Sequence, residues 1–147
     1  MIMYKICDID KKWFKFFNKE FEIDKELREI IFILNYAIGC DTDFCCRGRY
    51  TIRGMNDQRT KDGRHSLTAY ISFEKRLSHK IIKEAIRLGL QVTHNRGFGG
   101  TNISVLDLYP ECSKCHPFSC NCKGLIKKRI IQNKKFPNKI KRLFKIK

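Results

Sequence analysis

The sequence predicts an α+β fold, with a mainly antiparallel sheet and two or three packed helices. Its 147 residues have the length of one domain, and a hydrophobic content of 42% is higher than disordered chains have. Two segments with helical periodicity are each followed by two segments that alternate like strands. The expected order is therefore helix, two strands, helix, two strands, which favours hairpins over parallel β-α-β units.

The N-terminal part predicts a short strand over residues 4–7 and a helix capped by Asp10. This helix carries four aromatic residues, Trp13, Phe14, Phe16 and Phe17. Aromatic residues at helical spacing are typical of a stripe that faces the core. The alternative is that Trp13 or Phe16 is exposed and stacks on nucleic-acid bases, beside Lys11, Lys12 and Lys15.

A second helix is expected over residues 25–38, with Asp24 as its N-cap and Gly39 as its stop. Its apolar residues occupy more than one face, so it is the predicted central core helix. The turn-rich residues 40–46 follow. Residues 47–53 then alternate basic and packed positions, which predicts a strand with three arginines on one side.

After a polar loop over residues 54–64, residues 66–73 predict the partner strand of a long-looped hairpin. A helix over residues 79–88, capped by Ser78 and stopped by Gly89, comes next. Its predicted inward residues are Ile81, Ile82, Ala85 and Ile86. Residues 90–93 and 101–108 predict a second pair of strands.

This order of elements resembles the layout of the LAGLIDADG homing endonucleases. The first core helix, however, ends Tyr36-Ala37-Ile38-Gly39-Cys40-Asp41 and lacks that family's acidic residue between small residues at the helix end. The resemblance is one of topology alone. Asp41 and Asp43 could hold magnesium, so a metal-dependent nuclease is the third hypothesis for function.

The chain is predicted to divide into a globular domain over residues 1–110, a Cys-rich segment over 111–123 and a basic amphipathic tail over 124–147. Residues 123–147 hold eleven of the 31 basic residues and none of the 15 acidic ones. A local excess of positive charge attracts polyanions. Two short amphipathic segments separated near Pro137 are expected in the tail, and these would order against the body or a partner.

The Cys-rich segment contains half of the eight cysteines within eleven residues. Cys-x2-Cys is a common way to hold two thiolates on one zinc ion, so a structural zinc site is predicted. Its ligands would be Cys112, Cys115, Cys120 and Cys122, with His116, Cys40, Cys45 and Cys46 as alternates. Disulfides are favoured instead in a virion or an oxidising lumen, and palmitoylation beside a polybasic segment is a further reading.

The predicted nucleic-acid contacts are basic residues and one aromatic ring. Arg96 and Phe98 belong to a Gly-rich loop that could let a phosphate or base approach, although a hairpin connection explains this loop equally well. The candidates are Arg47, Arg49, Arg53, Arg59, Lys61, Arg64, Arg96, Phe98, Lys127, Lys128, Arg129, Lys134, Lys135, Lys141 and Arg142.

The leading hypothesis for function is a nucleic-acid-binding protein without catalytic activity, stabilised by zinc, that binds DNA or RNA mainly through phosphates. The second is an adaptor whose Cys-rich basic tail binds an anionic membrane or an acidic protein partner. The sequence has no recognisable signal peptide and no apolar run long enough to cross a bilayer, so an intracellular location, cytoplasm or nucleus, is expected.

Overall fold

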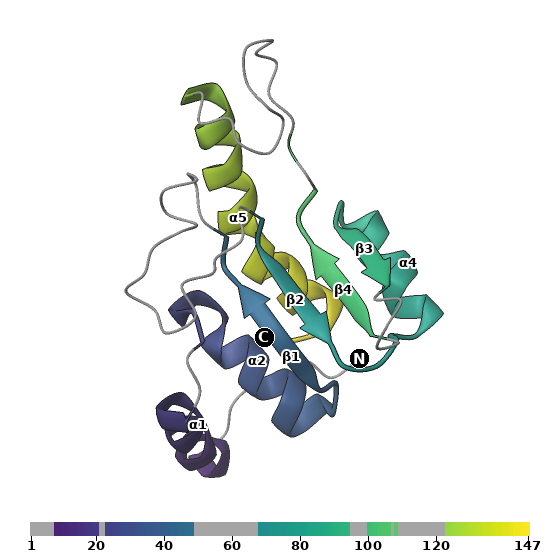
Figure 1. Ribbon diagram of the computed structural model, residues 1–147. Coiled ribbons are helices and arrows are strands. Elements are labelled where there is room, and N and C mark those ends of the chain that lie inside the picture. Colours follow the sequence, from purple (N-terminus) through teal and green to yellow (C-terminus); the bar gives the residue numbers. More distant parts are fainter. Residues whose placement is uncertain (1–7, 21–22, 49–67, 95–99, 107, 109–122) are drawn as a thin grey trace.

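The computed structural model describes residues 8–20, 23–48, 68–94, 100–106, 108 and 123–147. Figure 1 shows the arrangement of its helices and strands. In chain order these are α1 (Asp8–Glu20), the 3-10 turn η1 (Lys25–Leu27), α2 (Arg28–Ile33), the π-helical turn η2 (Leu34–Ile38), β1 (Thr42–Cys46), β2 (Tyr70–Phe73), α4 (His79–Arg87), β3 (Gln91–His94), β4 (Thr101–Ser104) and α5 (Lys123–Leu143).

The four strands of the described chain form one antiparallel sheet in the order β1-β2-β4-β3. Ile103 of β4 lies opposite Ile71 of β2 on one side and Val92 of β3 on the other. The sheet is thus two hairpins joined through β2 and β4, and the predicted α+β class with a mainly antiparallel sheet is confirmed.

Residues 40–46 were expected to be turn-rich, and this was wrong, because β1 lies within them. The strand predicted over residues 47–53 falls mostly outside the described residues. Asn35 explains this difference. Its Oδ1 accepts a hydrogen bond from the Thr42 amide and its Nδ2 donates one to Thr42 Oγ1, both at 2.9 Å. This pair of bonds ties the start of β1 to the end of the preceding helix, seven residues earlier in the chain, and local composition does not reveal it.

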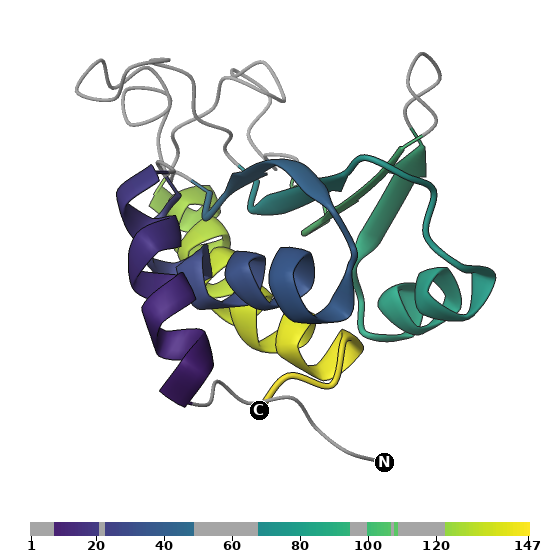
Figure 2. The same ribbon diagram turned by 90° about the horizontal axis from the view of Figure 1, so that it is seen from below.

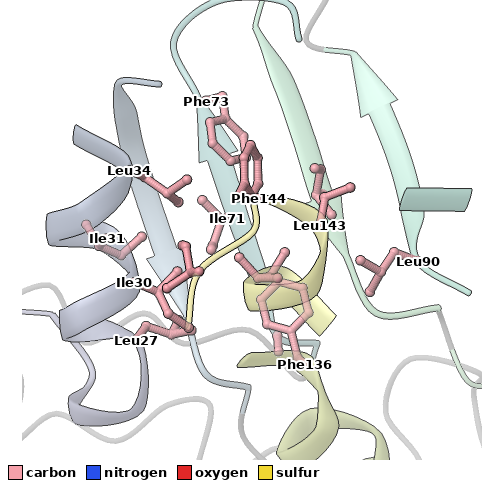
Figure 3. Packing of buried hydrophobic residues seen from close by; sticks show 14 of the residues in the cluster. Leu27, Ile30, Ile31, Leu34, Ile71, Phe73, Leu90, Phe136, Leu143 and Phe144 are labelled. Carbon is pink, nitrogen blue, oxygen red and sulfur yellow. The ribbon is translucent and has the colours of Figure 1, made fainter. Parts of the chain in front are cut away.

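A single hydrophobic cluster fills the space between the sheet and the helices. Figure 2 shows that α2 and α5 lie together on one side of the sheet, and Figure 3 shows their side chains meeting those of the strands. The ring of Phe73 on β2 lies 5.6 Å, centroid to centroid, from that of Phe144 just beyond α5. The largest side chains of this cluster that are almost completely buried are Phe32, Phe73 and Phe136.

Helix α5 corrects the prediction that the C-terminal segment breaks near Pro137. One helix runs from Lys123 to Leu143 with Pro137 inside it. Proline removes a backbone donor and destabilises a helix interior. Here the residues on either side of it, Phe136 and Ile140, are completely buried in the core cluster, and this packing offsets the cost. Residues 124–147 therefore pack against the body, while the predicted boundary at 111–123 falls mostly outside the described residues.

Asn133 fixes α5 to the sheet end. Its Oδ1 accepts a hydrogen bond of 3.0 Å from the backbone amide of Ala69, just before β2. Gly48, with φ of +86°, lies so close that a Cβ atom there would stand 2.4 Å from Asn133 Cγ. Only glycine allows both this conformation and this approach. Asn133 also lies four residues before Pro137. Its backbone carbonyl therefore receives no helical hydrogen bond from Pro137, because proline has no N–H to donate.

The predicted helix ends were right in three places and wrong in others. Gly89 follows α4 with φ of +81°, as its predicted stop. The Ser78 hydroxyl accepts a hydrogen bond from the Ile81 amide, and Gly39 ends the core helix in the left-handed conformation, as expected. Asp24 makes no capping bond, because its Oδ2 accepts instead from the Arg47 amide at 2.9 Å. The first helix begins at Asp8, two residues before the predicted cap at Asp10. Ile86, predicted to point inward, is 59% exposed.

Candidate nucleic-acid interface

The predicted zinc ligands Cys112, Cys115, Cys120 and Cys122, and the alternate His116, lie outside the described residues. Within the described ranges, no group of three or more His, Cys, Asp or Glu side chains is arranged to hold a metal ion. The zinc site therefore stays a prediction.

Three alternate ligands, Cys40, Cys45 and Cys46, are in the described part of the chain. Cys45 and Cys46 are consecutive in β1, and consecutive strand residues point to opposite faces of a sheet. Cys45 packs against the core, whereas the Cys46 thiol accepts a hydrogen bond from the Gly48 amide. Burial, then the charge of Asp24, raises the pKa of Cys45 to about 12. These two thiols thus do not converge on one point.

Of the three arginines predicted to lie on one side of a strand, the described residues include Arg47. Arg47 follows β1 and its guanidinium lies 3.4 Å from a carboxylate oxygen of Glu26, so its charge is already paired. The remaining candidates from this region fall outside the described residues: Arg49, Arg53, Arg59, Lys61, Arg64, Arg96 and Phe98. Gly100, at the end of the Gly-rich loop, has a structural role, because a Cβ atom there would meet the Phe73 carbonyl oxygen at 2.2 Å.

Helix α5 separates its apolar and basic residues by face. Phe136, Ile140 and Leu143 are buried in the core, whereas the basic candidates recur as pairs seven residues apart. Seven residues are close to two helical turns, so the pairs share one face at intervals of about 10 Å. Lys127, Lys128, Lys134, Lys135 and Arg142 are exposed, and Lys141 is half-buried. Arg129 differs, because only 5% of it is exposed, and burial removes it from the surface contacts.

Helix α1 carries an exposed patch that sequence reasoning had assigned mainly to the core. Phe14 and Phe17 pack against the core as expected, but Trp13 is 53% exposed and Phe16 is 56% exposed. Tyr36, from the end of the core helix, is also exposed and stacks on Trp13. Four lysines lie between residues 11 and 19 of the same helix, without an acidic residue among them. The aromatic stripe is thus split between core and solvent.

A pocket of about 430 Å³ lies between α4 and the end of α5. Ile81 and Leu143 supply apolar wall. Glu84 is the acidic residue in the lining, and its hydrogen bond to Arg87 lowers its pKa. The basic residues of the lining are Lys80, Lys83, Arg87 and Lys145. This pocket adds to the positive charge near the C-terminal end of α5.

Comparison of the chain with protein-family models, with curated proteins and with solved structures gave no match. The helices of the described residues include none that is both long enough and apolar enough to span a membrane.

Proposed function

We propose that this protein binds nucleic acid through phosphate contacts and does so without catalysis. The observation that supports the proposal is the division of α5, which commits its apolar face to the core and turns basic pairs toward solvent. Ammonium groups at about 10 Å intervals along a rigid helix form an electrostatic footprint for a polyanionic backbone. The zinc ion, if held by Cys112, Cys115, Cys120 and Cys122, has a structural part only.

The same division of α5 argues against the membrane alternative. An amphipathic helix that lies on a bilayer inserts its apolar face among the lipids. In α5 that face is occupied, because Leu125, Phe136 and Ile140 are buried against the rest of the protein. A membrane would meet only the lysine face of this helix, so its binding would rest on electrostatic attraction alone, without inserted apolar area.

The test is a salt titration of DNA and RNA binding with a variant of the basic face. Lys127, Lys128, Lys134 and Lys135 are replaced together by Gln, each being exposed. Because each phosphate contact contributes about 0.7 to 0.9 to the slope of log affinity against log salt, loss of four contacts should flatten the slope by roughly 3.

The matched control removes the same charge from four exposed residues outside α5, namely Lys25, Lys75, Arg76 and Lys83. A smaller change in slope is expected for this control. Absence of binding to DNA and RNA at ~50 mM salt, or equal slope changes in both variants, would overturn the proposal. Tight binding of the wild type to phosphatidylserine vesicles in place of nucleic acid would support the adaptor alternative instead.

A further inference from the structure

Three aromatic rings form a column that runs from the core to the surface. Phe32 on α2 is buried, with 2% of it exposed. The Tyr36 ring stacks on it, with 4.9 Å between centroids and 17° between planes. The Trp13 ring stacks on Tyr36 in turn, at 6.4 Å and 30°. Since Trp13 is half-exposed and Tyr36 is 47% exposed, the column ends in ring surface that solvent can reach.

The outer rings of this column are held by the core. Phe14 and Phe17 of α1 meet the same Phe32 ring edge-on, at centroid distances of 5.3 and 5.5 Å. These contacts fix α1, and hence Trp13, relative to α2. A ring that is already ordered loses little conformational entropy when a ligand stacks on it. Phe16 adds a second exposed ring, edge-on to Trp13 at 6.4 Å and 88°.

Lysines line the same side of α1. Phe16 lies four residues after Lys12 and three before Lys19, so all three share one face of the helix. Lys12, Lys15 and Lys19 are exposed. Exposed rings beside a row of ammonium groups match a ligand that has flat apolar faces on an anionic backbone.

We propose that Trp13 and Phe16, with Tyr36 packed behind Trp13, form a stacking platform for the bases of single-stranded nucleic acid, with Lys12, Lys15 and Lys19 contacting its phosphates. This inference rests on the proposed function and names its substrate class. A duplex keeps its base faces stacked on one another, so unpaired bases are the form that a ring platform can take. A protein partner fits less well, because lysine is depleted at the centres of protein interfaces.

Trp13 makes the platform directly measurable, because it is the single tryptophan of the chain. Titration of the wild type at ~50 mM salt with a 15-nucleotide oligo(dT) should quench the tryptophan fluorescence, since a stacked base contacts the indole face. The duplex of this oligo(dT) with oligo(dA) of the same length should quench it much less. The same titration with oligo(rU) extends the test to RNA.

Two variants are matched to this measurement by fluorescence anisotropy of labelled oligonucleotide. Trp13→Ala should weaken binding of the single strand by roughly 10-fold to 100-fold, the range that loss of one base-stacking ring produces. Trp13→Phe keeps a ring and should retain most of the affinity. The control is Ile86→Ala, which removes an equally exposed apolar side chain on α4 and should leave binding unchanged.

The outcome separates this inference from the proposed function. Stacking is not ionic, so Trp13→Ala should lower affinity without altering the salt slope, whereas the α5 lysine variant alters the slope. Binding that depends on the α5 lysines but is unaffected by Trp13→Ala, with no quenching, overturns the platform and leaves the proposed function standing. Self-association in sedimentation that Trp13→Ala abolishes would also overturn it, in favour of a second copy as the partner. Failure of every nucleic acid to bind overturns both.

Discussion

Cys45 on β1 and Cys40, which lies just before that strand, show how burial controls thiol chemistry. Cys45 packs against the core, and the resulting loss of solvation disfavours the thiolate more than any other influence on it. The carboxylate of Asp24 adds to this effect. Cys40 is less enclosed, and burial and Asp41 also raise its pKa. Because the thiolate is the reactive and metal-binding form, Cys45 is the less reactive thiol of the two.

We therefore predict slow alkylation of Cys45 by iodoacetamide in the folded protein. With a pKa raised to about 12, the thiol stays protonated at neutral pH, and its alkylation rate should keep rising with pH up to at least pH ~10 without levelling off. Cys40 should react at least tenfold faster at pH ~8. Peptide mass spectrometry after timed labelling, with and without prior chelation, measures both rates, and urea-unfolded protein is the control in which they should become similar. Equal rates in the folded state contradict the assignment.

At the scale of elements, α5 joins the C-terminal segment to the core. The adjacent residues Lys135 and Phe136 lie on different faces of this helix. Lys135 is exposed and Phe136 is completely buried. Phe136→Ala should lower the free energy of unfolding by about 3 to 5 kcal/mol, through lost burial and an internal cavity. Lys135→Ala should change it by less than about 0.5 kcal/mol. Urea denaturation followed by circular dichroism measures both.

Phe136→Leu keeps most of the buried volume and provides a folded variant in case Phe136→Ala does not fold. Its expected cost is below about 1.5 kcal/mol. If Phe136→Ala and Lys135→Ala prove equally mild, α5 does not contribute to the core, and the charge division on which the proposed function depends is lost with it.

Hydrophobic periodicity was sufficient to predict the order of the elements between residues 25 and 104, because apolar residues recur there at helical or alternating spacing. It failed at Pro137, where the local helix-breaking signal is opposed by tertiary packing of Phe136 and Ile140. It was also incomplete for α1. Four aromatic residues among five helical positions spread over about 160° of the helix, which is wider than the stripe that faces a core. This spread could have predicted that Trp13 and Phe16 are exposed.

For the molecule as a whole, elements that pack in the core precede and follow the Cys-rich segment. Strand β4 precedes it and pairs with two strands, and α5 follows it and contacts α2 and α4. The direction of α5 is thus set by buried contacts such as those of Phe136 and Phe144. Zinc bound by this segment would cross-link the connection between β4 and α5, two elements that already pack in the core.

This arrangement gives a prediction for the whole protein. Protein purified without added zinc should contain about one zinc per chain by elemental analysis, and Cys112→Ser with Cys115→Ser should remove it, while Cys7→Ser, outside the candidate ligand set, should not. Because Phe136 and Phe144 pack α5 and its end into the core, chelation should lower the thermal midpoint but leave a cooperative transition, unlike a zinc finger, which unfolds when its metal is removed. Complete loss of the transition on chelation would show that the metal, and not the packing of Phe136 and Phe144, holds α5 in place. Folded protein that contains no metal would dismiss the site.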